Sequence, residues 1–208
     1  MIEVVVFTFV FAWFNGYKWK VLNLFKHWSI YPIALTCVAH IYIIYLMVHG
    51  QYWFMEYAKY IKIVSILLYL GLICKYKLFD ISIFKKINIK ENPILTPFTS
   101  PVSLGVLCMG IGSVLNIIAM KFNGSKMPVF ASVSFGTGYS KIDMFDKMLQ
   151  YNDFHVFGNS ATHLIFLTDF IDIFTSIMSI GDVLTRIFVV LVIYYSIKVC
   201  NHKVINNI

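Results

Sequence analysis

The chain has 208 residues, of which 59% are apolar and only 13% are charged. A soluble domain carries roughly a quarter charged residues, so a soluble fold would leave most of its surface apolar. A bilayer removes this conflict because apolar side chains can face lipid. The net charge is +7, yet Arg186 is the sole arginine. Proteins that bind nucleic acid rely on arginine for bidentate contacts, so the composition excludes that partner and favours a membrane protein.

Five apolar runs predict transmembrane helices in chain order. A helix needs about 20 apolar residues to cross the hydrocarbon core of a bilayer. The runs cover residues 2–19, 30–48, 57–74, 101–120 and 180–199. We therefore expect an all-α polytopic helix bundle with about five spans, in a single integral membrane domain over residues 1–208.

The first and third runs depend on residues at the membrane interface. The strictly apolar part of the first run covers residues 2–14, about 20 Å of helix, so it must reach Tyr17 and Trp19 to cross. The third run has Lys59 and Lys62 in its first turns, where long side chains can extend to headgroups. Whether the first run crosses completely is left open by the sequence.

The lysines between the runs predict an orientation. Segments assigned to the inside hold ten basic residues against two acidic ones, whereas segments assigned to the outside hold six of each. By the positive-inside rule, the N-terminus is outside and the C-terminus is cytoplasmic. The excess of Lys, Ile and Asn is typical of an AT-rich genome, so we expect a bacterial cell membrane.

Two long loops separate the runs. The inner loop, residues 76–100, has Leu78, Ile81, Phe84 and Ile87 at helical spacing between lysines, which predicts a basic segment bound to anionic lipids. The outer loop, residues 122–178, forms a partly helical extracytoplasmic cap. Its Ser140 and Asp143 make a helix start signal for residues 141–151, and residues 164–174 are expected at or within the membrane surface.

A stripe of small residues marks one face of the fourth run. Its members recur every three or four residues: Gly105, Cys108, Gly112, Asn116 and Ala119. Small residues allow helices to approach closely, and an asparagine can bond across the contact, so the stripe predicts a helix-packing seam. A substrate path along this face is the alternative. The four cysteines are interpreted as small apolar side chains, and their spacing predicts no metal site.

Candidate ligand-binding residues gather at the outer side. Asp182 and Arg186 lie four residues apart at the start of the fifth run, where they can pair with each other or bind a ligand. Ser179 and Asp182 also have the spacing of a capping box. In the outer loop the candidates are Asn123, Lys126, His155, His163 and Asp169, with Asp172 nearby. Turn formation is the simpler role for Asn123, and no cofactor is indicated.

Part of the outer side resembles a known family. The residues involved are 123–128, His155, Leu164, Phe166, Leu167, Asp169, Ile171 and 179–182. Together they resemble a family of small bacterial membrane proteins, clostridial in type, that is recorded as a domain of unknown function. The resemblance covers the C-terminal half. It implies a second glycine where this chain has Ser125, and a proline where it has Asp172.

Three functions remain from these patterns. The leading hypothesis is a non-enzymatic membrane component that binds a ligand or a protein partner, or a second copy of itself, through the outer loop. The second is a membrane enzyme acting on a lipid or isoprenoid group, with His163 or His155 and Asp169 or Asp172 as acid–base groups. The third is a small transporter component, for which His40, Asn116, Asp182 and Arg186 are the few polar groups in the spans.

Overall fold

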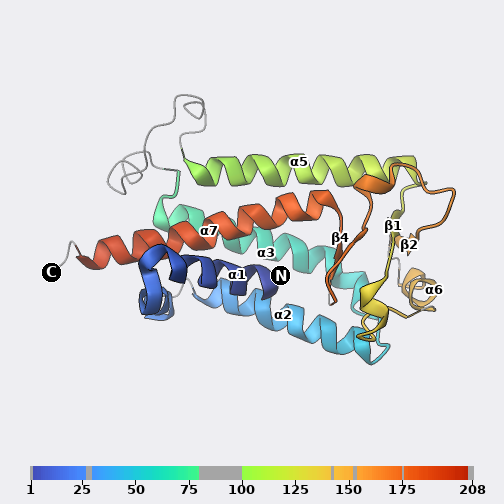
Figure 1. Cartoon of the computed structure of the whole chain (residues 1–208), viewed down its shortest axis with the longest axis horizontal. Helices are drawn as coiled ribbons and strands as arrows, with labels where there is room; N and C mark the ends of the chain where they lie inside the picture. The colour runs from blue at the N-terminus through green and yellow to red at the C-terminus, as the bar shows by residue number, and fades with distance from the viewer. Residues whose placement is uncertain are drawn as a thin grey trace. The chain divides into compact units, whose positions relative to one another are not determined.

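The computed structural model describes residues 2–26, 30–79, 100–141, 143–151, 154–174 and 176–205 (Figure 1). Most of these residues are helical. Each of the five predicted runs overlaps a helix: α1 (Ile2–Ala12), α2 (Ile30–Val48), α3 (Met55–Tyr76), α5 (Pro101–Phe122) and α7 (Ile180–Ile205). Most of the predicted inner basic loop, residues 80–99, lies outside the described residues.

Three helices in the described part of the chain are long and apolar enough to cross a membrane. They are Ile30–Val48, Pro101–Phe122 and Ile180–Asn201, of 19, 22 and 22 residues. At 1.5 Å per residue they reach roughly the thickness of the hydrocarbon core. Only 28%, 22% and 44% of their most apolar windows are buried within the protein, and all three helices carry exposed apolar side chains. This arrangement is that of a membrane protein.

The N-terminal run departs from the prediction of one helix over residues 2–19. Helix α1 ends at Ala12, and a π-type turn, Trp13–Tyr17, leads into a 3-10 helical segment, Lys18–Lys26. The backbone bends at Gly16, whose φ of 88° is readily adopted by glycine and ends a right-handed helix. The 11 residues of α1 extend about 16 Å, which is shorter than the hydrocarbon core.

The chain forms two compact units, which we describe separately. The helical unit contains Met1–Val38, Val64–Cys108 and Arg186–Ile208. The cap unit contains Ala39–Ile63 and Met109–Thr185. The helical unit thus holds the N-terminal segment and most of α7, whereas the cap unit holds the outer loop together with parts of the helices that precede and follow it.

Within the helical unit, α1 runs parallel to α7. Arg186 donates to Glu3 near the start of both helices. Further along, the rings of Phe11 and Tyr194 lie 5.3 Å apart. Because the same offset of 183 residues relates both pairs, the two helices stay in register. A buried hydrogen bond of 3.1 Å between the hydroxyls of Thr36 and Tyr69 joins α2 to α3 in the same unit.

The fold is mostly helical, as predicted, and the cap unit adds a few short strands. Strands β1 (Met127–Val129) and β2 (His155–Phe157) pair in parallel, and β3 (Ile171–Asp172) and β4 (Ile177–Met178) pair antiparallel. A parallel bridge also links Val129 to Asp169. Strands of two or three residues are too short to leave an alternating pattern in the sequence, so they could not be predicted from it.

An apolar core holds the cap unit together. Met144 and Met148 of α6 (Met144–Leu149) are buried with Val129 of β1. The same core contains Leu46 and Met47 from the end of α2, and Tyr52 and Phe54 from the segment between α2 and α3. Helix α6 is shorter than the predicted 141–151. Just before it, the Nζ of Lys141 donates to the carbonyl of Val48 at 2.7 Å. A cation there stabilises the C-terminal end of α2, whose last carbonyls lack helical partners.

Candidate functional site

Two glycines bring α5 and α7 into backbone contact within the cap unit. A Cβ atom added to Gly112 would lie 2.3 Å from the carbonyl oxygen of Gly181. A Cβ atom added to Gly181 would lie 2.1 Å from Oδ1 of Asn116 and 2.4 Å from the carbonyl oxygen of Gly112. All three separations are shorter than non-bonded atoms tolerate. Glycine is therefore required at both positions by space alone.

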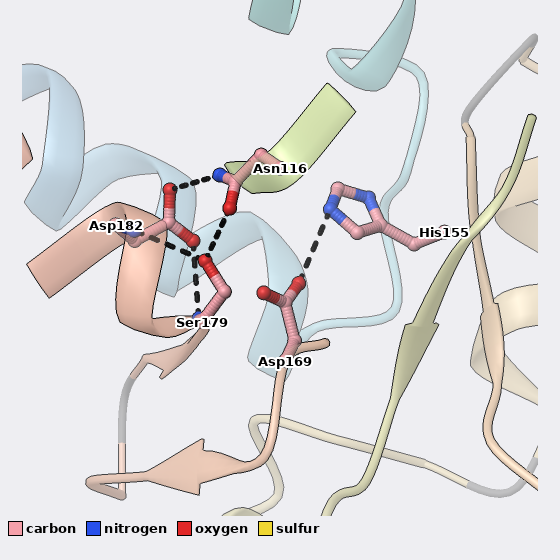
Figure 2. A network of polar contacts seen from close by, with 5 residues as sticks. All are labelled: Asn116, His155, Asp169, Ser179 and Asp182. Carbon is pink, nitrogen blue, oxygen red and sulfur yellow. Dashed lines mark hydrogen bonds and ion pairs between the residues drawn. The ribbon is translucent and has the colours of Figure 1, made fainter. Parts of the chain in front are cut away.

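A polar network lies at this contact. Asn116 of α5 donates its Nδ2 to Oδ1 of Asp182 at 3.1 Å, and its Oδ1 accepts from the Ser179 hydroxyl at 2.7 Å (Figure 2). Ser179 and Asp182 also bond each other's backbone amides, at 3.0 and 3.3 Å. This is the reciprocal capping box that the sequence predicts at the start of α7. Asn116 therefore ties α5 to the cap of α7.

The cap strands bring one imidazole close to one carboxylate. Nε2 of His155, in β2, lies 3.7 Å from Oδ2 of Asp169 (Figure 2). The side chain of Asp169 is 6% exposed and that of His155 is 28% exposed. The bridge from Asp169 to Val129 of β1, together with the pairing of β1 with β2, aligns the two residues. His155 and Asp169 form the pair in the described cap that is suited to proton transfer.

Asp172, also considered as an acid–base group, is bonded to a turn of the cap. Its Oδ2 accepts hydrogen bonds from the amides of Ser132 and Ser134, at 2.7 and 2.9 Å, and from the Ser134 hydroxyl at 2.8 Å. Partial burial opposes the charged carboxylate, but these donors outweigh it and hold the pKa of Asp172 below its ordinary value. The carboxylate fastens β3 to the 3-10 turn Val133–Phe135.

Asn123 bonds to the backbone of His163 and not to its imidazole. The Asn123 Nδ2 donates to the carbonyl of His163 at 2.9 Å, and its Oδ1 accepts from the His163 amide at 2.9 Å. The same Nδ2 bonds to the carbonyl of Ala119 in α5 at 2.8 Å. Asn123 thus caps α5 and fixes the chain at His163. The structure brings His155 to Asp169, whereas within the described part of the chain the His163 ring has no such carboxylate partner.

Arg186 is paired differently from the prediction. It bonds to Glu3 in the helical unit, whereas Asp182 bonds to Asn116 and Ser179 in the cap unit. The prediction of an Asp182–Arg186 pair is therefore wrong. Glu3 was not among the predicted site residues. A signal was nevertheless present: Glu3 is the sole acidic residue of the first apolar run, and Arg186 is the sole arginine. Spacing along α7 favoured the local pair, and only packing of α1 against α7 supplied the distant one.

The remaining candidate residues lie at a helix contact or in a turn. A Cβ atom at Gly105 would meet Leu191 and Phe188 of α7 at 3.1 and 3.2 Å, so α5 and α7 also pack closely in the helical unit. Cys108 is partly buried, and the amide of Lys126 bonds to the carbonyl of Asn123 in the turn after α5. Ser132 and Ser134 were missed, since nothing in their spacing connects them with Asp172. Among the described residues, no group of three His, Cys, Asp or Glu side chains could hold a metal.

The comparison with family models bears on these networks. Residues 97–194 match the model of a family described as "Family of unknown function (DUF5317)". The match confirms the predicted resemblance to a family of unknown function. It spans α5, the outer loop and the first half of α7, which include every cap network described above. No curated protein and no solved structure matches the chain.

Proposed function

We propose that the protein crosses a bacterial cell membrane five times, with its N-terminus outside and its C-terminus in the cytoplasm. The parallel contact of α1 with α7 supports the odd number, because two parallel helices in a membrane begin on the same side. The lysine asymmetry supports the direction. Since α1 is shorter than the hydrocarbon core, its crossing includes the bent segment up to Trp19, and local thinning of the bilayer accommodates it.

We further propose that it acts as a non-enzymatic component that binds a ligand or protein partner through the cap unit. The observation that supports this is that several polar side chains of the cap are hydrogen-bonded within it, whereas many of its large apolar side chains are exposed. Asn123, Asp172 and Asp182 are engaged in holding the cap together, as their hydrogen bonds indicate. Large apolar side chains of the cap, by contrast, are exposed. They are Val133, Phe135, Phe154, Ile165, Phe166, Phe170 and Phe174.

Two of these residues lie on neighbouring segments of the cap. The Thr137 hydroxyl donates to the carbonyl of Phe174 at 2.9 Å, which holds the segment carrying Phe174 beside the turn that carries Phe135. Their side chains are 60% and 40% exposed. Apolar side chains that a rigid scaffold holds toward solvent are typical of a binding surface. The Asp172 bonds to Ser132 and Ser134 supply that rigidity.

A photo-crosslinking amino acid at Phe174 tests this proposal in the membranes of cells that make the protein. We expect a discrete adduct of a protein or a small molecule at this position. The matched control is Ile117 on α5, which is 58% exposed and should give lipid adducts only. Lipid adducts alone at both positions would contradict a binding surface on the cap.

A membrane enzyme acting on a lipid or isoprenoid group is the second candidate, favoured by the His155–Asp169 pair. In this role His155 would transfer a proton, and the buried Asp169 would orient its ring. Purified protein incubated with labelled lipids should then yield a product that His155→Gln abolishes and His163→Gln does not. Equal turnover by both variants, or none by the unaltered protein, would reject this candidate.

A further inference from the structure

The segment from Trp13 to Lys26 in the helical unit exposes aromatic and basic side chains together. Its exposed apolar side chains include Phe14 at 83%, Trp19 at 71% and Phe25 at 59%. Three lysines, Lys18, Lys20 and Lys26, are also exposed, and the segment contains no acidic residue. Binding of a ligand or partner by the cap unit does not explain why this segment of the helical unit exposes aromatic and basic side chains together.

The two faces of this segment have different roles. Val21 and Leu24 are 7% and 1% exposed, so one face packs into the helical unit. Leu22 and Phe25, which are 47% and 59% exposed, lie on the other face with the lysines. A helical segment with a buried face, exposed aromatic side chains and basic residues is typical of one that lies in the membrane interface.

Hydrogen bonds fix this segment to the end of α7. Asn23 donates its Nδ2 to Oδ1 of Asn201 at 2.8 Å, and Nδ2 of Asn201 donates to the carbonyl of Lys20 at 3.2 Å. Asn201 is 4% exposed. The T-shaped contact of Trp13 with Trp19, at 4.7 Å between ring centroids, holds the two indoles together across the bend. The lysines are therefore displayed from a fixed framework.

We propose that residues Trp13 to Lys26 form a binding surface for the headgroups of anionic phospholipids. Two observations identify this occupant. The surface continues the exposed apolar face of α1, where Phe7 and Val10 are 57% and 48% exposed, so it adjoins lipid. Its three lysines are uncompensated within the segment, so an acidic headgroup complements them where a zwitterionic one does not. Tryptophan and lysine at this depth match the known preferences of the membrane interface.

This inference rests on the membrane insertion proposed above and adds the lipid class that this surface selects. It differs from the lipid contact predicted for residues 76–100, because it depends on residues that precede α2. Its fixed attachment to Asn201 also means that lipid bound here contacts a segment joined directly to the C-terminal turns of α7.

Full-length protein in vesicles provides the test, with tryptophan quenching by brominated lipids. The chain has four tryptophans, so a Trp28→Phe, Trp53→Phe background leaves Trp13 and Trp19 as reporters. Brominated phosphatidylglycerol should quench them in preference to brominated phosphatidylcholine by about fivefold or more, which is the preference expected from a single lysine near an acidic surface. The preference should weaken as salt is raised.

Lysine variants in the same background separate the possible outcomes. Replacing Lys18, Lys20 and Lys26 together by Gln should bring the preference to about one, and replacing them by Arg should retain it. The matched control replaces Lys121, Lys126 and Lys147 by Gln, which removes the same charge and should leave the preference unchanged. Strong but equal quenching by both lipids in the unaltered chain would overturn the inference while leaving insertion intact. Quenching by neither lipid would contradict the proposed insertion of this segment as well.

Discussion

The helical unit and the cap unit are stabilised in different ways. In the helical unit, several polar side chains pair with one side chain of another helix, as in Glu3–Arg186 and Thr36–Tyr69. In the cap unit, polar side chains are linked to backbone groups and to one another, as around Asn116 and Asp172. The difference has a physical origin. Helices satisfy their own backbone groups, whereas short strands and turns need side chains to satisfy theirs.

In the cap unit, the largest expected loss of stability comes from adding a methyl group where α5 and α7 are in backbone contact. Gly181→Ala places a methyl group onto Asn116 and Gly112, so we expect the free energy of unfolding in bicelles to fall by about 3 kcal/mol. Gly110→Ala on α5 is the matched control, because its added Cβ has no contact within 4 Å to the described residues outside its own helical turn. It should be neutral or stabilising by up to about 1 kcal/mol. Equal effects of the two variants would contradict the close approach.

In the helical unit, the largest expected effect is the loss of one charge from the Glu3–Arg186 pair. Glu3→Gln leaves the guanidinium of Arg186, which is 16% exposed, without its carboxylate, and should cost about 2 kcal/mol of unfolding free energy. Adding Arg186→Gln should recover part of this loss. Asp143→Asn is the control, since it breaks an exposed pair with Lys147 that solvent already screens. A Glu3→Gln effect no larger than the control would refute the role of the pair.

The next effect concerns pH and sharpens the contrast with the helical unit. The pKa of Asp172 is lowered in the folded cap, so its carboxylate stabilises the fold above its ordinary pKa near 4. That contribution is lost as the pH falls through the lower, folded pKa. Asp172→Asn should cost about 1 to 2 kcal/mol at neutral pH and abolish this acid dependence. Hydrogen exchange of the β3 amides across the acid range measures both effects.

Asp146→Asn on α6 is the control for this prediction, since Asp146 is exposed and should leave the acid dependence unchanged. An acid profile that stays the same in Asp172→Asn would show that the Ser132 and Ser134 bonds contribute nothing to the cap. The result would then remove the main contrast between the two units.

The smallest effect is a gain at the turn after α5. Ser125 has a φ of 63°, and its amide bonds to the carbonyl of Met120, so it occupies a left-handed position at a helix end. Ser125→Gly should raise the free energy of unfolding by about 1 kcal/mol, because glycine adopts this conformation without strain. Ser113→Gly within α5 should instead lower it by about 0.5 to 1 kcal/mol. A loss at Ser125 would mean that its hydroxyl matters more than its backbone.

The resemblance had implied a glycine at position 125, and the conformation there gives the physical reason. Sequence reasoning also located the helices and the Ser179–Asp182 capping box, because local spacing determines these features. It failed for Arg186, where a local partner was expected and a distant one is present. The cap strands could not be predicted because two or three residues leave no alternating pattern. The bonds of Asp172 could not be predicted because their donors lie about 40 residues away.

By itself, the sequence determined the apolar helices, the capping box that starts α7 and the small residues along α5. Each of these follows from hydropathy, turn chemistry or a spacing of three and four residues, which are properties of neighbours in the chain. Only the tertiary structure decided which polar groups meet. Glu3 bonds to Arg186, His155 lies beside Asp169, and Asp172 accepts from Ser134 because folding brings distant segments together. The cap therefore owes its shape to contacts that no local pattern in the chain records.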